Sequence, residues 1–283
     1  MSTFGAVWTH NSTRRGLGGQ DIPPMPDRWQ PDRSRGVFET LLVVDGEPVE
    51  LDAHLSRLAN SLEEIYSREL PTLVEEKLRR AAHGLDLGRL RITLAPAENG
   101  PRLDLLAGGV ESGAVFPVRG VDLRTHPIAG GLGAHKWVDR KGINRPAPGE
   151  AGALIADEGE VLEAGWANVF AVRGGTLFTP PLDGRLLPGT TRAALIELAA
   201  ANNIDTSEQP LTPNDLLTAE ETFLTGSIRG IEPALSLDGE KLPGCGDLSR
   251  RLGAALRQRW NLSDDSGAPA VPANEPKLGQ LSQ

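Results

Sequence analysis

Residues 163–192 constrain the fold of this chain more than any other segment. They begin with Glu163-Ala-Gly-Trp-Ala-Asn168-Val-Phe170 and end with Leu187-Pro-Gly-Thr-Thr-Arg192. Between these ends, a Gly174-Gly175 turn joins two short apolar runs, which predicts a β-hairpin. A helix is predicted to start at Thr190 or Thr191. The block therefore places a carboxylate beside a strand and a threonine-capped helix start about twenty residues later.

Glu163 is the first candidate for chemistry in this block. It lies among apolar and small residues, in Val161-Leu162-Glu163-Ala164-Gly165. Buried acids rarely lack a partner. A protonated pyridine nitrogen is a suitable partner, and its proton makes the ring an electron sink. Backbone amides at the end of a strand are the alternative partner.

The helix start Gly189-Thr190-Thr191-Arg192 offers hydroxyls and free backbone amides, which together form a seat for a phosphate group. A second turn of the same kind, Thr225-Gly226-Ser227-Ile228-Arg229-Gly230, could close on the same phosphate. Arg57, beside His54 on a predicted helix, is a candidate phosphate-binding cation. An exposed helical arginine is the alternative reading.

Lys136 lies upstream of the block, in His135-Lys136-Trp137-Val138-Asp139-Arg140. A lysine becomes a nucleophile near neutral pH when burial or nearby cations lower its pKa, and Arg140 and Lys141 could supply such cations. Taken alone, Lys136 is better interpreted as a solvated surface lysine. With the acid and the helix start, it suits a pyridine cofactor that carries an aldehyde and a phosphate.

Composition and charge exclude several classes of function. The chain has 283 residues and a net charge of −9, so nucleic acid and anionic membranes are not expected partners. No apolar stretch approaches a membrane span, and the first residues lack an apolar signal core, which favours a cytoplasmic protein. The single cysteine, Cys245, excludes an internal disulfide. The five histidines show no metal-ligand spacing, so no metal is expected.

We predict two domains with flanking segments. A strand at Gly36–Val44 ends at the Asp45-Gly46 turn, and Asp52 is predicted to cap a helix with one apolar face. The glycine-rich segment 128–134 marks a joint between domains. The predicted organisation is an irregular lead-in (1–35), a smaller α+β domain (36–127), a linker (128–134), a cofactor-binding domain (135–262) and a disordered tail (263–283).

These motifs together resemble the fold-type IV pyridoxal-phosphate enzymes. This family includes branched-chain aminotransferases, D-amino-acid aminotransferases and 4-amino-4-deoxychorismate lyases. The resemblance extends roughly from Gly36 to Trp260. It includes Phe38-Glu39-Thr40, His54-Leu-Ser-Arg57-Leu, Lys136, residues 163–170, Leu177-Phe-Thr-Pro-Pro181, residues 187–192 and residues 223–230. It implies an α/β fold of the D-amino-acid aminotransferase type, with an α+β N-terminal domain and an α/β C-terminal domain.

The resemblance also implies roles for individual residues. Lys136 would be the Schiff-base lysine and would move protons during the reaction, and Glu163 would pair with the pyridine nitrogen of pyridoxal 5′-phosphate. In the family the cofactor lies between two domains at a dimer interface, so a homodimer is implied. The residues expected to hold the phosphate by side chain or backbone amide are Arg57, Thr190, Thr191, Ser227 and Ile228.

Within the family, two motifs look more like the lyases. Lys136-Trp-Val-Asp139-Arg140 is similar to a lysine-x-x-Asn-Arg run, and Ser227-Ile-Arg229-Gly is similar to a Ser-Leu-Arg-Gly turn. No tyrosine stands five places after Lys136, where branched-chain aminotransferases carry one; Lys141 is there instead. The leading hypothesis is a lyase that releases pyruvate and 4-aminobenzoate, with Arg229 and Arg140 contacting substrate carboxylates.

Two other functions remain open. One is a transaminase that acts on branched-chain or D-amino acids with 2-oxoglutarate, using the same lysine, acid and phosphate seat. The other is a catalytically silent relative on the same scaffold. The presence of both Lys136 and Glu163 argues against the silent relative, since a silent copy need not keep both.

Overall fold

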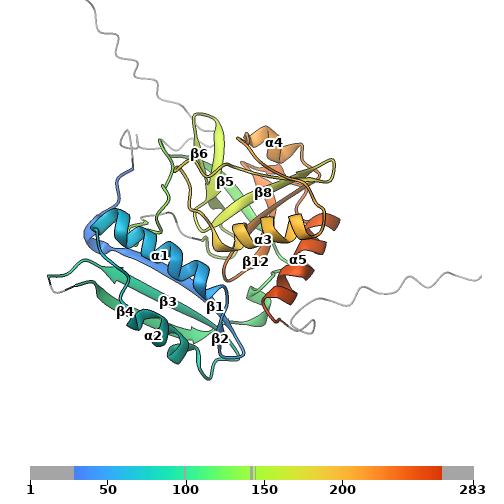
Figure 1. The fold of residues 1–283 in the computed structure, drawn as a ribbon. Coiled ribbons are helices and arrows are strands. Elements are labelled where there is room, and N and C mark those ends of the chain that lie inside the picture. Colours follow the sequence, from blue (N-terminus) through green and yellow to red (C-terminus); the bar gives the residue numbers. More distant parts are fainter. Residues whose placement is uncertain (1–28, 99, 141–142, 144, 263–283) are drawn as a thin grey trace, which may run out of the picture.

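The chain folds into two sheets with helices packed against each (Figure 1). The computed structural model describes residues 29–262 except 99, 141, 142 and 144. Most of the predicted lead-in and the predicted tail therefore lie outside the described residues. The described part of the lead-in ends in a short 3₁₀ turn, η1 (Arg33–Arg35).

The first sheet has four antiparallel strands in the order β2-β1-β3-β4. Its strands are β1 (Val37–Val44), β2 (Glu47–Pro48), β3 (Leu87–Ala95) and β4 (Arg102–Gly109). The predicted turn between β1 and β2 is confirmed: Asp45 and Gly46 have φ of 49° and 80°, the left-handed pair that a tight hairpin needs. Helices α1 (Leu51–Tyr66) and α2 (Leu73–Ala82) cover one face of this sheet (Figure 1).

Helix α1 presents the apolar face that its sequence predicts, with Leu58 and Leu62 buried against the sheet. The predicted cap was wrong, because the helix starts at Leu51, one residue before Asp52. Glu50 occupies the cap position in a left-handed conformation and makes no side-chain cap. Its carboxylate instead accepts two hydrogen bonds from Arg259, at 2.6 and 3.0 Å.

The second sheet has nine strands in the order β10-β9-β8-β11-β12-β5-β6-β7, with β13 beside β12. Strand β7 also pairs with β8, which closes six of the strands into a ring. Its strands are β5 (Val121–Pro127), β6 (Gly152–Asp157), β7 (Glu160–Ala164), β8 (Ala167–Arg173), β9 (Thr176–Thr179), β10 (Thr206–Glu208), β11 (Glu221–Gly226), β12 (Gly230–Leu237) and β13 (Glu240–Lys241).

Three helices accompany this sheet. They are α3 (Thr190–Ala201), α4 (Pro213–Leu217) and α5 (Asp247–Arg259), and the 3₁₀ turn η2 (Ser112–Ala114) lies between the sheets in sequence. Helices α3 and α5 pack on the stacked rings of Phe170 and Phe223, 5.5 Å apart. Leu42 and Val44 of β1 join the same core, so the two sheets share an apolar contact.

The chain passes from the first sheet to the second before it reaches the predicted linker (128–134). The last strand of the first sheet ends at Gly109, and β5 (Val121–Pro127) already pairs with β12 and β6 of the second sheet. The predicted smaller domain (36–127) thus contains one strand of the other sheet. A strand's own sequence does not reveal which sheet it joins. We propose that the division falls between residues 109 and 121.

No helix in the described part of the chain is long and apolar enough to cross a membrane.

Candidate active site

Lys136 is held at the edge of β1 by backbone pairing. The amide of Phe38 donates to the carbonyl of Lys136 at 2.9 Å, and the amide of Val138 donates to the carbonyl of Gly36 at 3.0 Å. The short strand β2 pairs only with the other end of β1, so this edge is free to accept residues 136–138. The pairing fixes the Lys136 backbone, and its side chain is only 14% exposed.

The surroundings of Lys136 lower its pKa from 10.5 to about 7. Burial is the main cause, because it disfavours the charged ammonium. The negative charge of Glu39, whose Oε2 lies 4.0 Å from the Lys136 Nζ, opposes the shift. The charges of Arg57, Arg140 and Arg91 lower the pKa further. The amine is therefore partly neutral near pH 7, as a nucleophile or proton acceptor must be.

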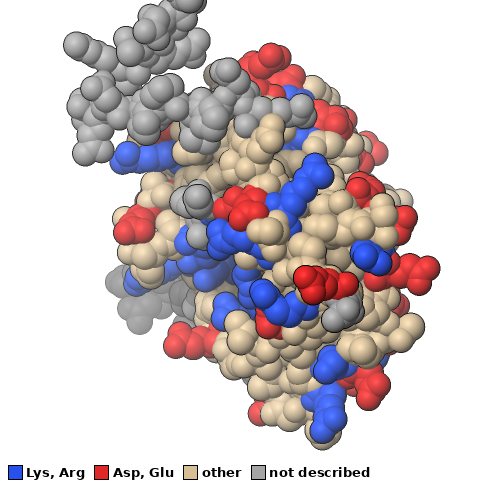
Figure 2. Space-filling model, turned by 90° about the vertical axis from the view of Figure 1, so that its left-hand side faces the viewer, with Lys and Arg blue, Asp and Glu red and all other residues tan. Residues whose placement is uncertain are grey.

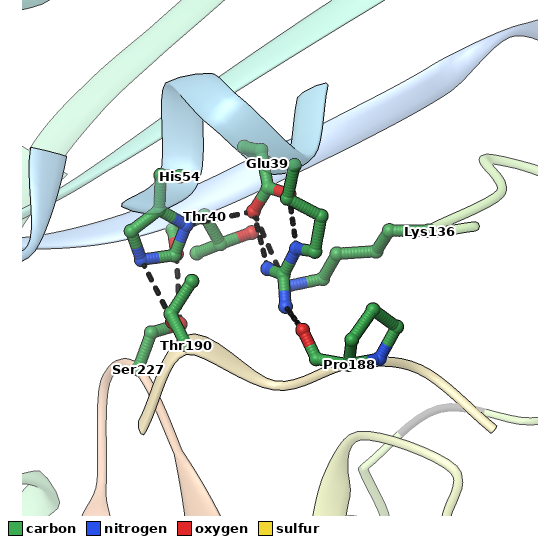
Figure 3. A network of polar contacts seen from close by, with 8 residues as sticks. Glu39, Thr40, His54, Lys136, Pro188, Thr190 and Ser227 are labelled. Carbon is green, nitrogen blue, oxygen red and sulfur yellow. Dashed lines mark hydrogen bonds and ion pairs between the residues drawn. The ribbon is translucent and has the colours of Figure 1, made fainter. Parts of the chain in front are cut away.

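Glu39 organises the side of the site formed by β1 and α1 (Figure 3). Its carboxylate accepts two hydrogen bonds from Arg57, both 2.7 Å, and one from His54 Nδ1 at 2.8 Å. Burial raises the pKa of Glu39, but Arg57, His54 and Lys136 together hold it well below its usual range. Glu39 is thus a permanent carboxylate that fixes the Arg57 guanidinium in the plane of its own oxygens.

His54 extends this network to the start of α3. Burial is the main cause that lowers the pKa of its ring, so the neutral form is favoured. Because ionised Glu39 can only accept, His54 Nδ1 carries the proton and Nε2 accepts from the Thr190 hydroxyl, 3.2 Å away. Figure 3 shows His54 reaching from α1 toward Thr190, while Lys136 enters from the other side.

The loop before α3 is tied down from both sheets. Arg57 donates to the carbonyl of Pro188 at 2.7 Å, and Asn168 of β8 donates to the carbonyl of Leu187 at 2.9 Å. A Cβ at Gly189 would lie 1.9 Å from the Asn168 Oδ1, so only glycine allows this approach. Gly189, not a threonine, is the N-cap of α3, and no side chain caps it. The first backbone amides of α3 are thus available to an anion.

Glu163 lies on β7, directly opposite Asn168 of β8. It is 2% exposed, and its Oε1 has no hydrogen-bond partner. Burial raises its pKa to about 7, although Arg140, a hydrogen bond from the Leu187 backbone, Arg57 and Lys136 each lower it. A buried carboxylate oxygen without a partner is rare in folded proteins. It fits a ring N–H donor, which would supply both a hydrogen bond and a positive charge.

The structure brings most of the predicted site residues to one cavity, which we name the inner cavity. Its walls include Glu163, Lys136, the first residues of α3 and the turn after β11. This is the arrangement that the sequence analysis requires: an amine, an acid and a phosphate seat around one space. The residues that line it are Arg57, Lys136, Arg140, Glu163, Trp166, Ala167, Asn168, Leu187, Gly189, Thr190, Thr191, Thr225, Gly226 and Ser227.

The remaining predicted residues, Ile228 and Arg229, line an adjoining outer cavity of about 390 Å³. Lys136, Arg140 and Ser227 line both cavities, so the amine stands where the two meet. Ser227 already donates to the carbonyl of Thr40 at 2.8 Å, which ties its turn to β1. The other residues of the outer cavity are Phe38, Thr40, Arg89, Arg91, Arg145, Gly165, Trp166, Ala167, Leu224, Thr225, Gly226 and Glu232.

Sequence reasoning gave no role to several residues at these cavities. Glu39 was part of a motif, but only the fold shows that it anchors Arg57. Arg89 and Arg91 stand at alternate positions of β3, opposite its buried leucine and isoleucine positions. Because side chains alternate between the two faces of a strand, this spacing places both arginines on the same face.

Comparison with known proteins gives a family and several relatives. The family model for amino-transferase class IV matches residues 36–115 and 132–237. A branched-chain-amino-acid aminotransferase of Escherichia coli is 36% identical over 109 residues, which span 38% of this chain and only 35% of that relative. A D-alanine aminotransferase of Bacillus licheniformis is 26% identical over 251 residues, spanning 78% of this chain and 86% of the relative.

Among solved structures, 4-amino-4-deoxychorismate lyase from Pseudomonas aeruginosa has a similar fold. Its TM-score is 0.66 at 26% identity, covering 80% of this chain and 91% of the lyase chain.

Proposed function

This chain belongs to the class IV aminotransferases, enzymes that depend on pyridoxal phosphate, and from that membership we propose that it is a lyase acting on 4-amino-4-deoxychorismate. The products would be 4-aminobenzoate and pyruvate. The observation that carries the proposal is the position of Lys136 between two cavities. One cavity suits a cofactor, because it ends in the unpartnered oxygen of Glu163. The other is open to a substrate.

Different residues of the inner cavity would bind the two ends of the cofactor. Glu163 would accept the pyridine N–H, and the amides and hydroxyls at the start of α3, with Arg57 and Ser227, would hold the phosphate. Ile228 would contribute by its backbone amide. Two of the five Arg57 donors remain for the phosphate, because Glu39 and Pro188 use three.

Pyridoxal phosphate supplies an aldehyde that captures an amine and a ring that accepts electrons. The chain's own part is proton transfer. Lys136, with its pKa lowered to about 7, can take a proton from the substrate carbon that bears the amine. It can return this proton to the methylene carbon of the enolpyruvyl group as the bond between the ring and that group's oxygen breaks, which gives 4-aminobenzoate and pyruvate. Phe38 and Trp166 line the outer cavity around it.

Two observations favour the lyase over other reactions of the family. The Lys136-Trp-Val-Asp139-Arg140 run and the Ser227–Gly230 turn both border the outer cavity. The outer cavity is rich in arginine, which suits a substrate with carboxylates.

A transaminase is the second candidate, and the sequence relatives favour it. The relatives from Escherichia coli and Bacillus licheniformis are named as aminotransferases. They share the family with this chain, so the lysine and the cofactor seat do not separate the two reactions.

A product assay separates them. The purified protein, loaded with pyridoxal phosphate, is given 4-amino-4-deoxychorismate, and 4-aminobenzoate and pyruvate are measured by chromatography. In parallel it is given leucine, D-alanine or glutamate with a 2-oxo acid. We expect 4-aminobenzoate without any added 2-oxo acid. Amino transfer from the panel without 4-aminobenzoate would contradict the lyase and support the transaminase.

The proposal includes a homodimer in the cytoplasm. The resemblance to the family, in which the cofactor lies at a dimer interface, supports the assembly. Light scattering on the purified protein tests the assembly, and a monomer at micromolar concentration would contradict it.

A further inference from the structure

The segment that carries Lys136 divides its side chains between two faces. Lys136 and Arg140 line both the inner and the outer cavity. The backbone of this segment is extended, because it pairs with β1 and places Trp137 opposite Val37. Side chains alternate along an extended chain, so the residues between and beside the cavity-lining pair point away from the cavities. These outward residues are His135, Trp137 and Asp139.

Two of the outward residues bind the segment to the first sheet and its helix. Trp137 is 6% exposed and belongs to the apolar core that α1 shares with this sheet. The Nδ1 atom of His135 lies 3.1 Å from the Ser61 hydroxyl of α1. The rings of His135 and Trp137 meet edge-on at 5.6 Å, as expected for neighbours on one face. Both residues beside the amine are thus held by α1.

Asp139, the third outward residue, binds the lead-in instead. Its Oδ2 accepts from the backbone amide of Asp32 at 2.9 Å, and its Oδ1 accepts from the Arg35 guanidinium at 3.2 Å. Asp139 is 7% exposed, so both contacts offset the desolvation of a buried carboxylate. They join the segment of the amine to residues more than one hundred places earlier in the chain.

The part of the lead-in that Asp139 contacts is itself fixed. The Tyr66 hydroxyl of α1 donates to the carbonyl of Arg33 at 2.7 Å. After η1 the chain enters β1 through Gly36, which has φ of 85°. A Cβ at Gly36 would lie 2.1 Å from the carbonyl oxygen of Leu94, so only glycine allows this entry. Asp139 is therefore bound to a rigid support.

Arg140, the residue after Asp139, connects this anchor to the chemistry. Burial raises the pKa of Glu163 and lowers that of Lys136, and the Arg140 charge lowers both. Figure 2 shows Lys and Arg side chains gathered near the middle of one face, although the chain as a whole is acidic. Charge interactions depend on distance, so a displaced Arg140 would change the protonation of both groups.

We propose that Asp139 is a positioning residue, which anchors the segment of Lys136 and Arg140 to the lead-in and so fixes the amine where the two cavities meet. This inference rests on the proposed function for the role of Lys136 as the reacting amine. It does not depend on whether the reaction is a lyase reaction or a transamination. It gives the lead-in residues Asp32 and Arg35 a part in supporting the active site.

Steady-state kinetics across pH test the proposal, on the full chain loaded with pyridoxal phosphate and with the substrate that the product assay identifies. Asp139→Ala should lower kcat about 10²-fold, because an amine displaced by about 1 Å loses its alignment. KM should change by less than about threefold. The acid limb of the kcat profile should move up by about one pH unit, because a less confined Lys136 regains solvent and its pKa rises.

Hydrogen exchange gives a readout that does not involve turnover. In the cofactor-free full chain, amides of residues 136–140 should exchange about tenfold faster in Asp139→Ala than in the wild type, because the segment opens more often. Unchanged exchange in this segment would show that the Asp139 carboxylate does not hold it.

Further variants locate the effect. Asp139→Asn keeps one oxygen acceptor, so its kcat should lie within about tenfold of the wild type. Arg35→Ala removes the contact at Oδ1 from a side chain that is 47% exposed, and it should lower kcat about threefold. In the Asp139→Ala background it should have no further effect, because Arg35 acts through Asp139. If thermal unfolding shows that Asp139→Ala is not folded, Arg35→Ala and Asp139→Asn still report.

Asp104→Ala is the matched control. Asp104 pairs with Arg102 at the same distance, 3.2 Å, but its side chain is 59% exposed on β4. This variant should leave kcat, its acid limb and the exchange of residues 136–140 unchanged.

The outcomes separate the anchor from the proposed function. With the cofactor trapped by borohydride on Lys136, a kcat of Asp139→Ala within about twofold of the wild type overturns the positioning role. A fall in kcat with an unmoved acid limb also overturns it and leaves Asp139 a structural role alone. Trapping on another lysine instead refutes the proposed role of Lys136, and with it the premise of this inference.

Discussion

Two buried glutamates flank Lys136, and they differ in their hydrogen-bond partners and in the direction of their pKa shifts. Glu39, from the β1–α1 side, has an arginine and a histidine hydrogen-bonded to it, so it stays ionised. Glu163, from the β7–β8 side, keeps an oxygen without a partner, and its pKa is raised to about 7. Both are 2% exposed, so burial alone does not distinguish them.

The difference shows which acid belongs to the scaffold and which awaits a ligand. A satisfied carboxylate stabilises the folded chain before anything binds, because its desolvation is offset by fixed partners. An unsatisfied one destabilises the empty protein and gains its partner on binding. Glu39 thus positions Arg57 and the amine, whereas Glu163 is poised for the cofactor ring.

Removing the amine between the two acids should have the largest effect. Lys136→Ala is expected to lower turnover about 10³-fold or more, because no other group replaces its proton transfer. Borohydride reduction followed by peptide mass mapping should trap the cofactor on Lys136 in the wild type and on no peptide in the variant. A trapped peptide elsewhere in the wild type would assign the lysine role to another residue.

Removing Glu39, the carboxylate that has hydrogen-bond partners, should lower the free energy of unfolding. Glu39→Ala leaves Arg57 buried without its partner, and we expect the cofactor-free protein to lose about 3–5 kcal/mol of unfolding free energy in urea. Glu47→Gln is the control, since the Glu47 side chain is 78% exposed and pairs only with Arg79 at 3.4 Å. A loss below 1 kcal/mol at Glu39 would mean that the network with Arg57 and His54 is not a unit of the scaffold.

Substitution of Glu163, the carboxylate with an unpartnered oxygen, should affect turnover rather than stability. Glu163→Gln is expected to keep or raise the stability of the cofactor-free protein and to retain the cofactor, but to lower turnover about 10²-fold, because a neutral amide does not hold the ring proton. Absorbance of the bound cofactor and steady-state rates measure the two effects. Near-normal turnover would remove Glu163 from the proposed role.

The pH dependence of stability gives the smallest effect. The folded pKa of Glu163, about 7, exceeds its ordinary value of 4.5, so the folded state binds more protons between these values. Stability from this group is therefore present in acid and is lost as pH rises from about 4.5 to 7. The lowered pKa of Glu39 gives the opposite sign, a contribution that is lost as pH falls below its ordinary range.

Urea unfolding of the cofactor-free protein across this range checks the sign. The advantage of Glu163→Gln over the wild type should grow with pH, by about 3 kcal/mol at most near pH 7. A constant difference between the two proteins from pH 5 to 7 would show that Glu163 is ionised throughout.

Much of the fold could be predicted from local patterns. The Asp45-Gly46 hairpin and the apolar face of α1 follow from turn chemistry and periodicity. The start of α3 at Thr190 was also predicted, although its N-cap is Gly189 and not a threonine. The sheet that receives β5 could not be predicted, because strand pairing is set by distant residues. The predicted cap of α1 was also wrong. Glu50 occupies the cap position, and its carboxylate is hydrogen-bonded by Arg259, more than two hundred residues away in the sequence.

The sequence alone determined the chemical inventory: a lysine, an acid and a glycine-threonine helix start in an order that resembles one enzyme family. Only the tertiary structure decided how each group behaves. Burial lowers the pKa of Lys136 and raises the pKa of Glu163, and Glu39 holds the Arg57 side chain in position. Burial and pairing arise when β1, β7 and α3 meet, and no single segment of the chain carries that information.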